Sequence, residues 1–263
     1  MMADALAASA VDVEYAVPDG RTSRTWDPSP EDVQKLQTAG VILLNGAGYE
    51  PWAQRLSLPR SRTVDTSSGY RARLLRVADD VTHQHGPVGQ QSNRDAIPTT
   101  WLEPELASAQ LGRVEEQLVR MVPDAADAVS QRATAIRNGL KQLGRKMAQL
   151  RAETSAREVT VATDEPDFQY LTSGLGWKIH QIQWASNDIL TPESVAAFTE
   201  HSVQLIMIRP DGNQTRIEQL RALDIPCVAV DTCEFALRDA DTADSLVARL
   251  SANLDLFCTE LGL

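Results

Sequence analysis

The stretch that decides the fold is residues 123–156, which reads PDAADAVSQRATAIRNGLKQLGRKMAQLRAETSA. After Pro123 it contains no further proline, and it is rich in residue types that favour helices. Its apolar residues recur in steps of three and four: Val129, Ala133, Ile136, Leu140, Leu143, Met147 and Leu150. This spacing predicts one continuous helix with a single apolar stripe.

The predicted helix is about 45–50 Å long at ~1.5 Å per residue, which is longer than a small domain is wide. A seven-residue repeat is compatible with a coiled-coil arm. Patterns of alternating strands and helices on both sides favour the other interpretation, a strut that joins two lobes. In that case the two lobes, and not a partner helix, cover Leu140, Leu143, Met147 and Leu150.

The segments before the strut predict an α/β lobe. Strands are expected at Val11–Val17, Val41–Asn45 and Arg62–Asp65, and helices at Glu31–Ala39, Glu50–Leu56 and Leu102–Met121. Residues Asp79 to Thr99 are polar and lack periodicity, so they are expected to form a long loop.

A second alternating series follows the strut. Strands are expected at Glu158–Ala162, Lys178–Gln183, Gln204–Ile208 and Cys227–Val230, and helices at about Pro166–Ser173, Pro192–His201, Gln214–Leu223 and Thr242–Leu261. Alternation of this kind implies parallel sheets. The predicted fold is therefore α/β, with two Rossmann-like lobes (1–121 and 157–263) joined by one long helix (122–156).

Composition excludes several classes of function. The chain has 263 residues and a formal net charge of −11, which argues against nucleic acid or an anionic membrane as the main partner. Its apolar runs are far shorter than a membrane helix requires, and the first ten residues lack the pattern of a secretory signal. Three cysteines without a CxxC pair indicate neither a zinc knuckle nor a disulfide framework, although a Cys227–Cys233 bridge is one option.

An enzyme is the least favoured class. Gly46-Ala47-Gly48 lies between a predicted strand and a predicted helix, where a nucleotide-binding loop would sit. The third glycine of such a loop is missing, since Glu50-Pro51 follow. The sequence also lacks a GxSxG elbow, an HExxH pair and a P-loop lysine.

Three motifs together resemble one family. They are Thr25-Trp26-Asp27-Pro28-Ser29-Pro30 with the later Asn45-Gly46-Ala47-Gly48-Tyr49-Glu50-Pro51-Trp52, then Thr100-Trp101-Leu102-Glu103-Pro104, and Val161 to Tyr170 followed by Gly174-Leu175-Gly176. They are similar to motifs of the substrate-binding proteins of zinc and manganese ABC importers, the cluster with one rigid linking helix. The resemblance runs nearly end to end.

The resemblance implies a metal held in the cleft between the lobes. Carried over one by one, the four ligand positions of the family fall on Arg24, Thr99, Glu165 and Asp231. The two oxygen ligands, Glu165 and Asp231, are present, but both imidazoles are absent. Arg24 places a permanent cation where the ion belongs, so an unaltered family site is not expected.

Nitrogen ligands are available in the predicted loop. His83 and His85 lie where one branch of the family carries a histidine-rich segment. They are expected either to complete a zinc or manganese site with Glu165 and Asp231 or to be solvated side chains that bind metal only weakly.

The start of the chain also departs from the family. Relatives begin with an inner strand, whereas this chain begins within the following helix, so we expect a truncated start without a signal peptide. A sheet without an inner strand leaves backbone groups unpaired, which predicts a perturbed first lobe or pairing with another chain.

The function implied by the resemblance is a periplasmic or extracytoplasmic binding protein that is not an enzyme and delivers a divalent cation to an ABC permease. The alternative is a degenerate homologue that no longer binds transition metal. In that alternative Arg24 pairs with Asp231 or Glu165 and replaces the ion electrostatically.

Overall fold

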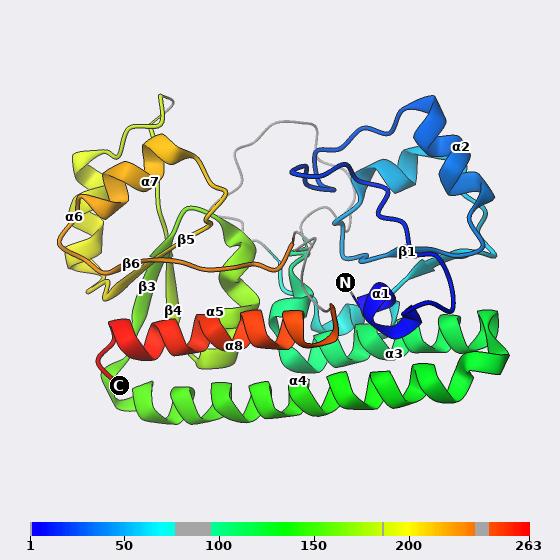
Figure 1. Ribbon diagram of the computed structural model, residues 1–263. Helices are drawn as coiled ribbons and strands as arrows, with labels where there is room; N and C mark the ends of the chain where they lie inside the picture. Colours follow the sequence, from blue (N-terminus) through cyan, green and yellow to red (C-terminus); the bar gives the residue numbers. More distant parts are fainter. Residues whose placement is uncertain (1, 77–95, 186, 235–241) are drawn as a thin grey trace. The chain divides into compact units, whose positions relative to one another are not determined.

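The computed structural model describes residues 2–76, 96–185, 187–234 and 242–263, with the side chains of residues 242–245 left out (Figure 1). The chain divides into two compact units. The N-terminal unit comprises Met1–Lys141 and Glu234–Val247, and the C-terminal unit comprises Gln142–Cys233 and Ala248–Leu263. Most of the predicted loop 79–99 lies outside the described residues.

The predicted long helix is confirmed. It is α4 (Ala126–Thr154), with one short 3₁₀ helix directly before it (η6, Pro123–Ala125) and another directly after it (η7, Ser155–Arg157). The seven residues of its apolar stripe are all at most 5% exposed within the single chain. Leu140, Leu143, Met147 and Leu150 are therefore buried without a partner helix, as the strut interpretation predicts. The division between the two units falls within α4, after Lys141.

The N-terminal unit contains a small parallel sheet of two strands among its described residues, β1 (Ile42–Leu44) and β2 (Thr63–Asp65), with Ile42 opposite Thr63. Its other elements are α1 (Met2–Ala7), α2 (Pro30–Thr38), η1 (Pro51–Arg55), η2 (Ser68–Arg73), η5 (Thr100–Leu102) and α3 (Pro104–Met121). Helix α2 begins where the sequence predicts, because Ser29 and Asp32 form a reciprocal capping box and Pro30 occupies the first turn.

The prediction of a strand at Val11–Val17 is wrong. These residues form bends and irregular backbone. The apolar and polar residues do alternate along the segment, but a strand also needs a neighbouring strand to receive its backbone hydrogen bonds. Within the described residues β1 pairs only with β2, so Val11–Val17 has no such partner.

The C-terminal unit is built on four parallel strands in the order β4-β3-β5-β6. They are β3 (Thr160–Thr163), β4 (Lys178–Gln181), β5 (Leu205–Ile208) and β6 (Cys227–Ala229). The connecting elements are η8 (Pro166–Phe168), α5 (Gln169–Leu175), α6 (Pro192–Glu200) and α7 (Gln214–Arg221), and the chain ends in α8 (Thr242–Glu260). All the strands and helices predicted for this region are present, with ends shifted by a few residues.

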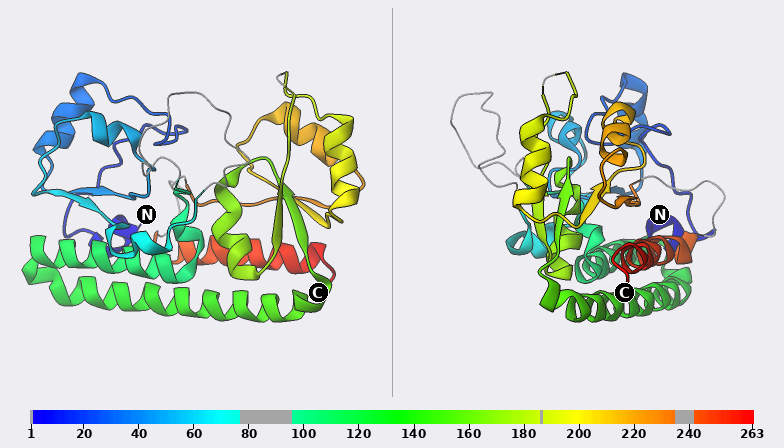
Figure 2. Two further views of the ribbon diagram at one scale, coloured as in Figure 1. Left: turned by 180° about the vertical axis from the view of Figure 1, so that it is seen from behind. Right: turned by 90° about the vertical axis from the view of Figure 1, so that its left-hand side faces the viewer.

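The core of the C-terminal unit lies around the two inner strands, β3 and β5. Every residue of both strands is buried. On one face Ala162, Ile206 and Ile208 pack with residues of α6 and α7. Figure 2 shows α8 beside the last part of α4, where the Lys146 ammonium contacts Ser251 and Asp255. Among the helices of the described residues, none has the length and apolar composition needed to cross a membrane.

Candidate metal centre

Glu165 lies two residues beyond the end of β3, in the C-terminal unit. Its backbone N–H donates to the Thr163 hydroxyl at 3.2 Å, and that hydroxyl donates back to the Glu165 carbonyl oxygen at 3.2 Å. This local turn leads the chain from the strand into η8. Glu165 as a whole residue is half-buried.

Asp231 lies two residues beyond the end of β6, in the same unit. Because the carboxyl ends of parallel strands meet at one edge of a sheet, Asp231 and Glu165 belong to the same edge. Asn253 on α8 accepts the Asp231 backbone N–H at 3.0 Å and donates to the Asp231 carbonyl oxygen at 2.8 Å. These two hydrogen bonds fix the backbone that carries the carboxylate.

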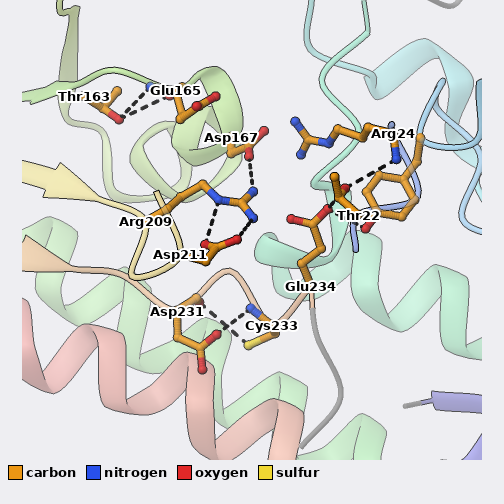
Figure 3. Close-up of polar contacts among 11 residues, drawn as sticks. Thr22, Arg24, Thr163, Glu165, Asp167, Arg209, Asp211, Asp231, Cys233 and Glu234 are labelled. Atoms are coloured by element: carbon orange, nitrogen blue, oxygen red, sulfur yellow. Dashed lines mark hydrogen bonds and ion pairs between the residues drawn. The ribbon is translucent and has the colours of Figure 1, made fainter. Parts of the chain in front are cut away.

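The Asp231 carboxylate is held by an arginine that the sequence analysis did not identify. Arg249 on α8 donates from Nε to Oδ2 at 2.5 Å and from Nη2 to Oδ1 at 2.6 Å. The backbone N–H of Cys233 donates to the same Oδ1 at 2.8 Å (Figure 3). The carboxylate oxygens of Asp231 are thus occupied by a bidentate ion pair and one backbone donor.

Two further arginines neutralise acidic residues near this edge of the sheet. Arg209, directly after β5, pairs with Asp167 and with Asp211, each at 2.7 Å (Figure 3). Arg216 on α7 pairs with Asp188 at 2.6 Å and with Asp164 at 3.7 Å. Burial raises the pKa of the Asp164 carboxyl, and the Arg216 charge opposes that shift. The edge is therefore largely charge-compensated by the protein itself.

Arg24, at the first family ligand position, lies in the N-terminal unit. Its guanidinium carbon is 5.7 Å from the centre of the Tyr49 ring, and its backbone N–H donates to the Thr22 hydroxyl at 3.3 Å. The contact with Tyr49 is a cation–π contact of the usual length. The predicted pairing of Arg24 with Asp231 or Glu165 stays a prediction.

Glu234 also belongs to the N-terminal unit and was not predicted as a functional residue. Its Oε1 accepts hydrogen bonds from the Thr22 hydroxyl at 2.5 Å and from the Tyr49 hydroxyl at 2.7 Å. Burial raises the pKa of the Tyr49 hydroxyl, and the nearby Glu234 charge adds to the shift. Tyr49 is therefore a neutral hydrogen-bond donor.

Thr99, at the second family ligand position, is fully buried at 0% exposure. It precedes η5, and its carbonyl oxygen accepts the Leu102 backbone N–H at 3.1 Å. Its position is that of a helix-initiating residue. His83 and His85 lie outside the described residues. Across the part of the chain that the structure describes, no three or more His, Cys, Asp and Glu side chains are grouped so as to hold a metal ion.

The Gly46-Ala47-Gly48 turn does not offer a free phosphate cradle. The Glu50 carboxylate accepts the backbone N–H groups of Asn45 at 2.8 Å and Gly46 at 3.0 Å, and the Ser67 hydroxyl accepts that of Ala47 at 3.0 Å. The amides that would bind a nucleotide phosphate are therefore already bonded. The alternative of a Cys227–Cys233 bridge is wrong, since both cysteines and Cys258 are free thiols.

The chain is similar to a known family of metal-uptake proteins. Residues 1–255 match the family described as ZnuA, zinc-uptake complex component A, periplasmic. The iron-binding protein YfeA of Yersinia pestis is 24% identical over 168 residues, which cover 63% of this chain and 50% of YfeA. The manganese-binding lipoprotein MntA of Halalkalibacterium halodurans is 23% identical over 221 residues, which cover 84% of this chain and 63% of MntA. The chain thus spans only about half to two thirds of these relatives.

Solved structures show the same fold. A mutant of the laminin-binding adhesin Lmb from Streptococcus agalactiae superposes with a TM-score of 0.78, covering 99% of this chain and 95% of that structure at 20% identity. The AdcAII protein of Streptococcus pneumoniae superposes with a TM-score of 0.73 at 17% identity, and the match covers 97% of this chain and 93% of AdcAII. Because the family match covers nearly the whole chain, this protein belongs to the ZnuA family of solute-binding proteins.

Proposed function

We propose that this chain is a metal-ion solute-binding protein with an altered site, which carries zinc or manganese outside the cytoplasm to an ABC permease and has no catalytic role. The proposal rests on family membership and on one geometric observation. Glu165 and Asp231, both partly exposed, follow two strands of one parallel sheet and lie at the same edge of it. Paired carboxylates in such a position are suitable oxygen ligands for a divalent cation.

The proposed ligand set combines these two oxygen donors with the imidazole nitrogens of His83 and His85. Mixed nitrogen and oxygen sets of this kind suit Zn²⁺ and Mn²⁺. Names of the relatives refer to iron, manganese and zinc, so the family accommodates several cations. Arg24 and Thr99 are not ligands in this proposal, because a guanidinium has no lone pair to offer and Thr99 is enclosed.

The Arg249–Asp231 pair reduces metal affinity but does not forbid binding. The Asp231 side chain is 39% exposed, and an ion pair so accessible to water contributes only about 1–3 kcal/mol. A metal ion bound with nanomolar affinity gains about 12 kcal/mol. Displacing the arginine therefore weakens binding by roughly five- to 150-fold.

A metal titration tests this function. Purified protein, stripped with a chelator, is titrated with Zn²⁺ and with Mn²⁺ while the affinity and the thermal midpoint are measured. We expect tight binding of at least one ion, with a loss of about 10- to 1000-fold in Glu165→Ala, in Asp231→Ala and in the double variant His83→Ala/His85→Ala. The control is Glu218→Ala, which removes an exposed carboxylate of α7 that has no side-chain hydrogen bond or ion pair within the described residues, and its affinity should match the wild type.

A second candidate function is a family member that no longer carries transition metal. The bidentate hold of Arg249 on Asp231 favours it, as does the lack of a three-residue ligand group among the described residues. It predicts no high-affinity signal for either ion and no thermal shift. That result would contradict the metal-carrier proposal, and unchanged affinity in the double histidine variant would remove the loop from the ligand set.

A further inference from the structure

The contacts around Asp231 divide into two groups with different roles. Asn253 holds the backbone of Asp231 through both its N–H and its carbonyl group, whereas Arg249 donates to the oxygens of the Asp231 carboxylate. The two residues lie four positions apart on α8, and hence on the same face of that helix. The position of the strand end therefore does not depend on the ion pair.

The Arg249–Asp231 pair differs in its exposure from the Arg209–Asp167 pair of the same edge. In the Arg209–Asp167 pair the two side chains are 11% and 0% exposed, so both charges are enclosed and depend on each other. In the Arg249–Asp231 pair the arginine is 13% exposed but the carboxylate is 39% exposed. Asp231 therefore presents part of its carboxylate to solvent, where a cation from solution can reach it.

A cation and Arg249 compete for the Asp231 oxygens. The guanidinium uses one donor on each oxygen. The Cys233 N–H takes a further acceptor site on Oδ1 (Figure 3). A carboxylate has about four lone-pair sites in all. A divalent ion that binds there adds two positive charges next to a permanent one, so the arginine must move away.

We propose that Arg249 is an internal counter-ion that competes with the metal ion for Asp231. This inference rests on the proposed function, because it assumes that Asp231 is a metal ligand. Without metal, Arg249 neutralises the carboxylate and keeps the charge at the sheet edge balanced. With metal, it is released while Asn253 keeps the strand end in place. Arg249 thus lowers the affinity of the site and sets the metal concentration at which it fills.

The test removes the competitor while keeping the ligand. Arg249→Gln removes the positive charge from Asp231, and Arg249→Lys keeps a charge without the bidentate geometry. The charge-matched control is Arg221→Gln, since Arg221 is an exposed residue at the end of α7 for which the structure gives no ion pair among the described residues. Zn²⁺ and Mn²⁺ affinities are measured for each variant, together with the thermal midpoint before and after addition of metal.

We expect Arg249→Gln to bind metal about tenfold more tightly than wild type, with Arg249→Lys between them and Arg221→Gln within about twofold of wild type. In Arg249→Gln the metal-free midpoint should fall and the rise on adding metal should increase. A purely structural arginine would lower the midpoint without tightening metal binding. Adding Asp231→Asn should remove the gain in affinity, because the carboxylate for which Arg249 and the metal ion compete is then absent.

The outcomes separate the two proposals. If wild type binds metal and Arg249→Gln binds no more tightly than Arg221→Gln, the counter-ion inference is wrong while the metal-carrier function stands. If only Arg249→Gln binds metal, the inference holds and the wild-type chain is the non-binding member described above. If neither binds, both the function and the inference are overturned.

Discussion

The sheets of the two units are stabilised in different ways. In the C-terminal unit β3 and β5 each lie between two other strands, and all their residues are buried. In the N-terminal unit β1 and β2 have only each other among the described residues, and five of their six residues are half-buried. The C-terminal sheet is therefore stabilised by burial of aliphatic side chains, while the N-terminal sheet needs support from its surroundings.

That support comes from specific polar and aromatic contacts. Gln110 on α3 donates to the Asn45 side chain at 2.7 Å and to the Thr66 hydroxyl at 3.2 Å, just beyond the ends of the two strands. Trp26 and Trp52 pack edge to face with ring centres 5.0 Å apart. The stability of the N-terminal sheet therefore depends on specific contacts of a few residues, whereas that of the C-terminal sheet depends on the burial of its apolar core.

The largest effect is expected from shortening a buried side chain of β5, one of the two inner strands of the C-terminal sheet. Ile206 is 0% exposed and packs in the core between the sheet and its helices, so Ile206→Ala should lower the free energy of unfolding by about 2–5 kcal/mol. The matched change in the N-terminal sheet is Leu43→Ala, at a half-buried position of β1, where about 1 kcal/mol is expected. Urea unfolding of both variants measures the difference. Equal losses would show that the two sheets rely on burial to the same degree.

The next largest effect is expected at the glycine turn of the N-terminal unit. Gly46 has φ +79°, and an added Cβ would lie 1.9 Å from Asp65 Oδ1 and 2.3 Å from Ser67 Oγ. Gly46→Ala should therefore cost about 2–4 kcal/mol through backbone strain and displacement of these two side chains. Gly69→Ala is the control, because a Cβ there meets nothing within 4 Å and should change the free energy of unfolding by less than about 0.5 kcal/mol. A Gly46→Ala protein as stable as the control would mean that the turn yields easily.

A smaller effect, visible as a pH dependence, is expected at Glu50. Burial raises the pKa of this carboxyl from 4.5 to about 7, against the opposing effect of the Asn45 and Gly46 N–H donors. The folded chain then binds a proton more tightly than the unfolded chain, so stability is greatest at low pH and falls as the pH rises from 4.5 to 7.

Between pH 5 and pH 8 this group alone should remove about 2–3 kcal/mol from the free energy of unfolding. The glutamine in Glu50→Gln cannot ionise. The free energy of unfolding of this variant should therefore not show the decrease of about 2–3 kcal/mol between pH 5 and pH 8 that Glu50 causes in the wild type. Urea unfolding of both proteins at several pH values measures the difference between them. A difference that stays constant, or that changes in the opposite direction, would show that the Glu50 carboxyl ionises normally in the folded protein.

Much of the fold could be predicted from sequence because its signals are local and repeated. The apolar stripe of α4 consists of seven residues at helical spacing, and all seven are buried in the structure. The run Leu205–Ile208 is wholly apolar, as expected for a strand covered on both faces, and it forms β5, one of the two inner strands of the C-terminal sheet. Ser29, Asp32 and Pro30 mark the start of α2 for a similar reason, since capping involves residues three positions apart.

The failure at Val11–Val17 shows the limit of such signals. Its alternation of apolar and polar residues is a property of the segment alone, but a strand exists only where another strand pairs with it. Nothing in those seven residues states whether the partner is present. In the structure the segment is irregular, and its apolar residues Ala16 and Val17 still pack against the cluster around Trp26 and Trp52.

By itself, the sequence determined the alternating α/β plan, the long helix and the positions of Glu165 and Asp231 after their strands. Only the tertiary structure decided which side chains meet those positions. Arg249 donates hydrogen bonds to Asp231, which lies 18 residues earlier in the sequence, and Tyr49 donates one to Glu234, which lies 185 residues later. Periodicity and capping act over three to seven residues, whereas an ion pair depends on where two remote backbones pass each other. That is why the positions of Glu165 and Asp231 after their strands could be predicted and the contact between Arg249 and Asp231 could not.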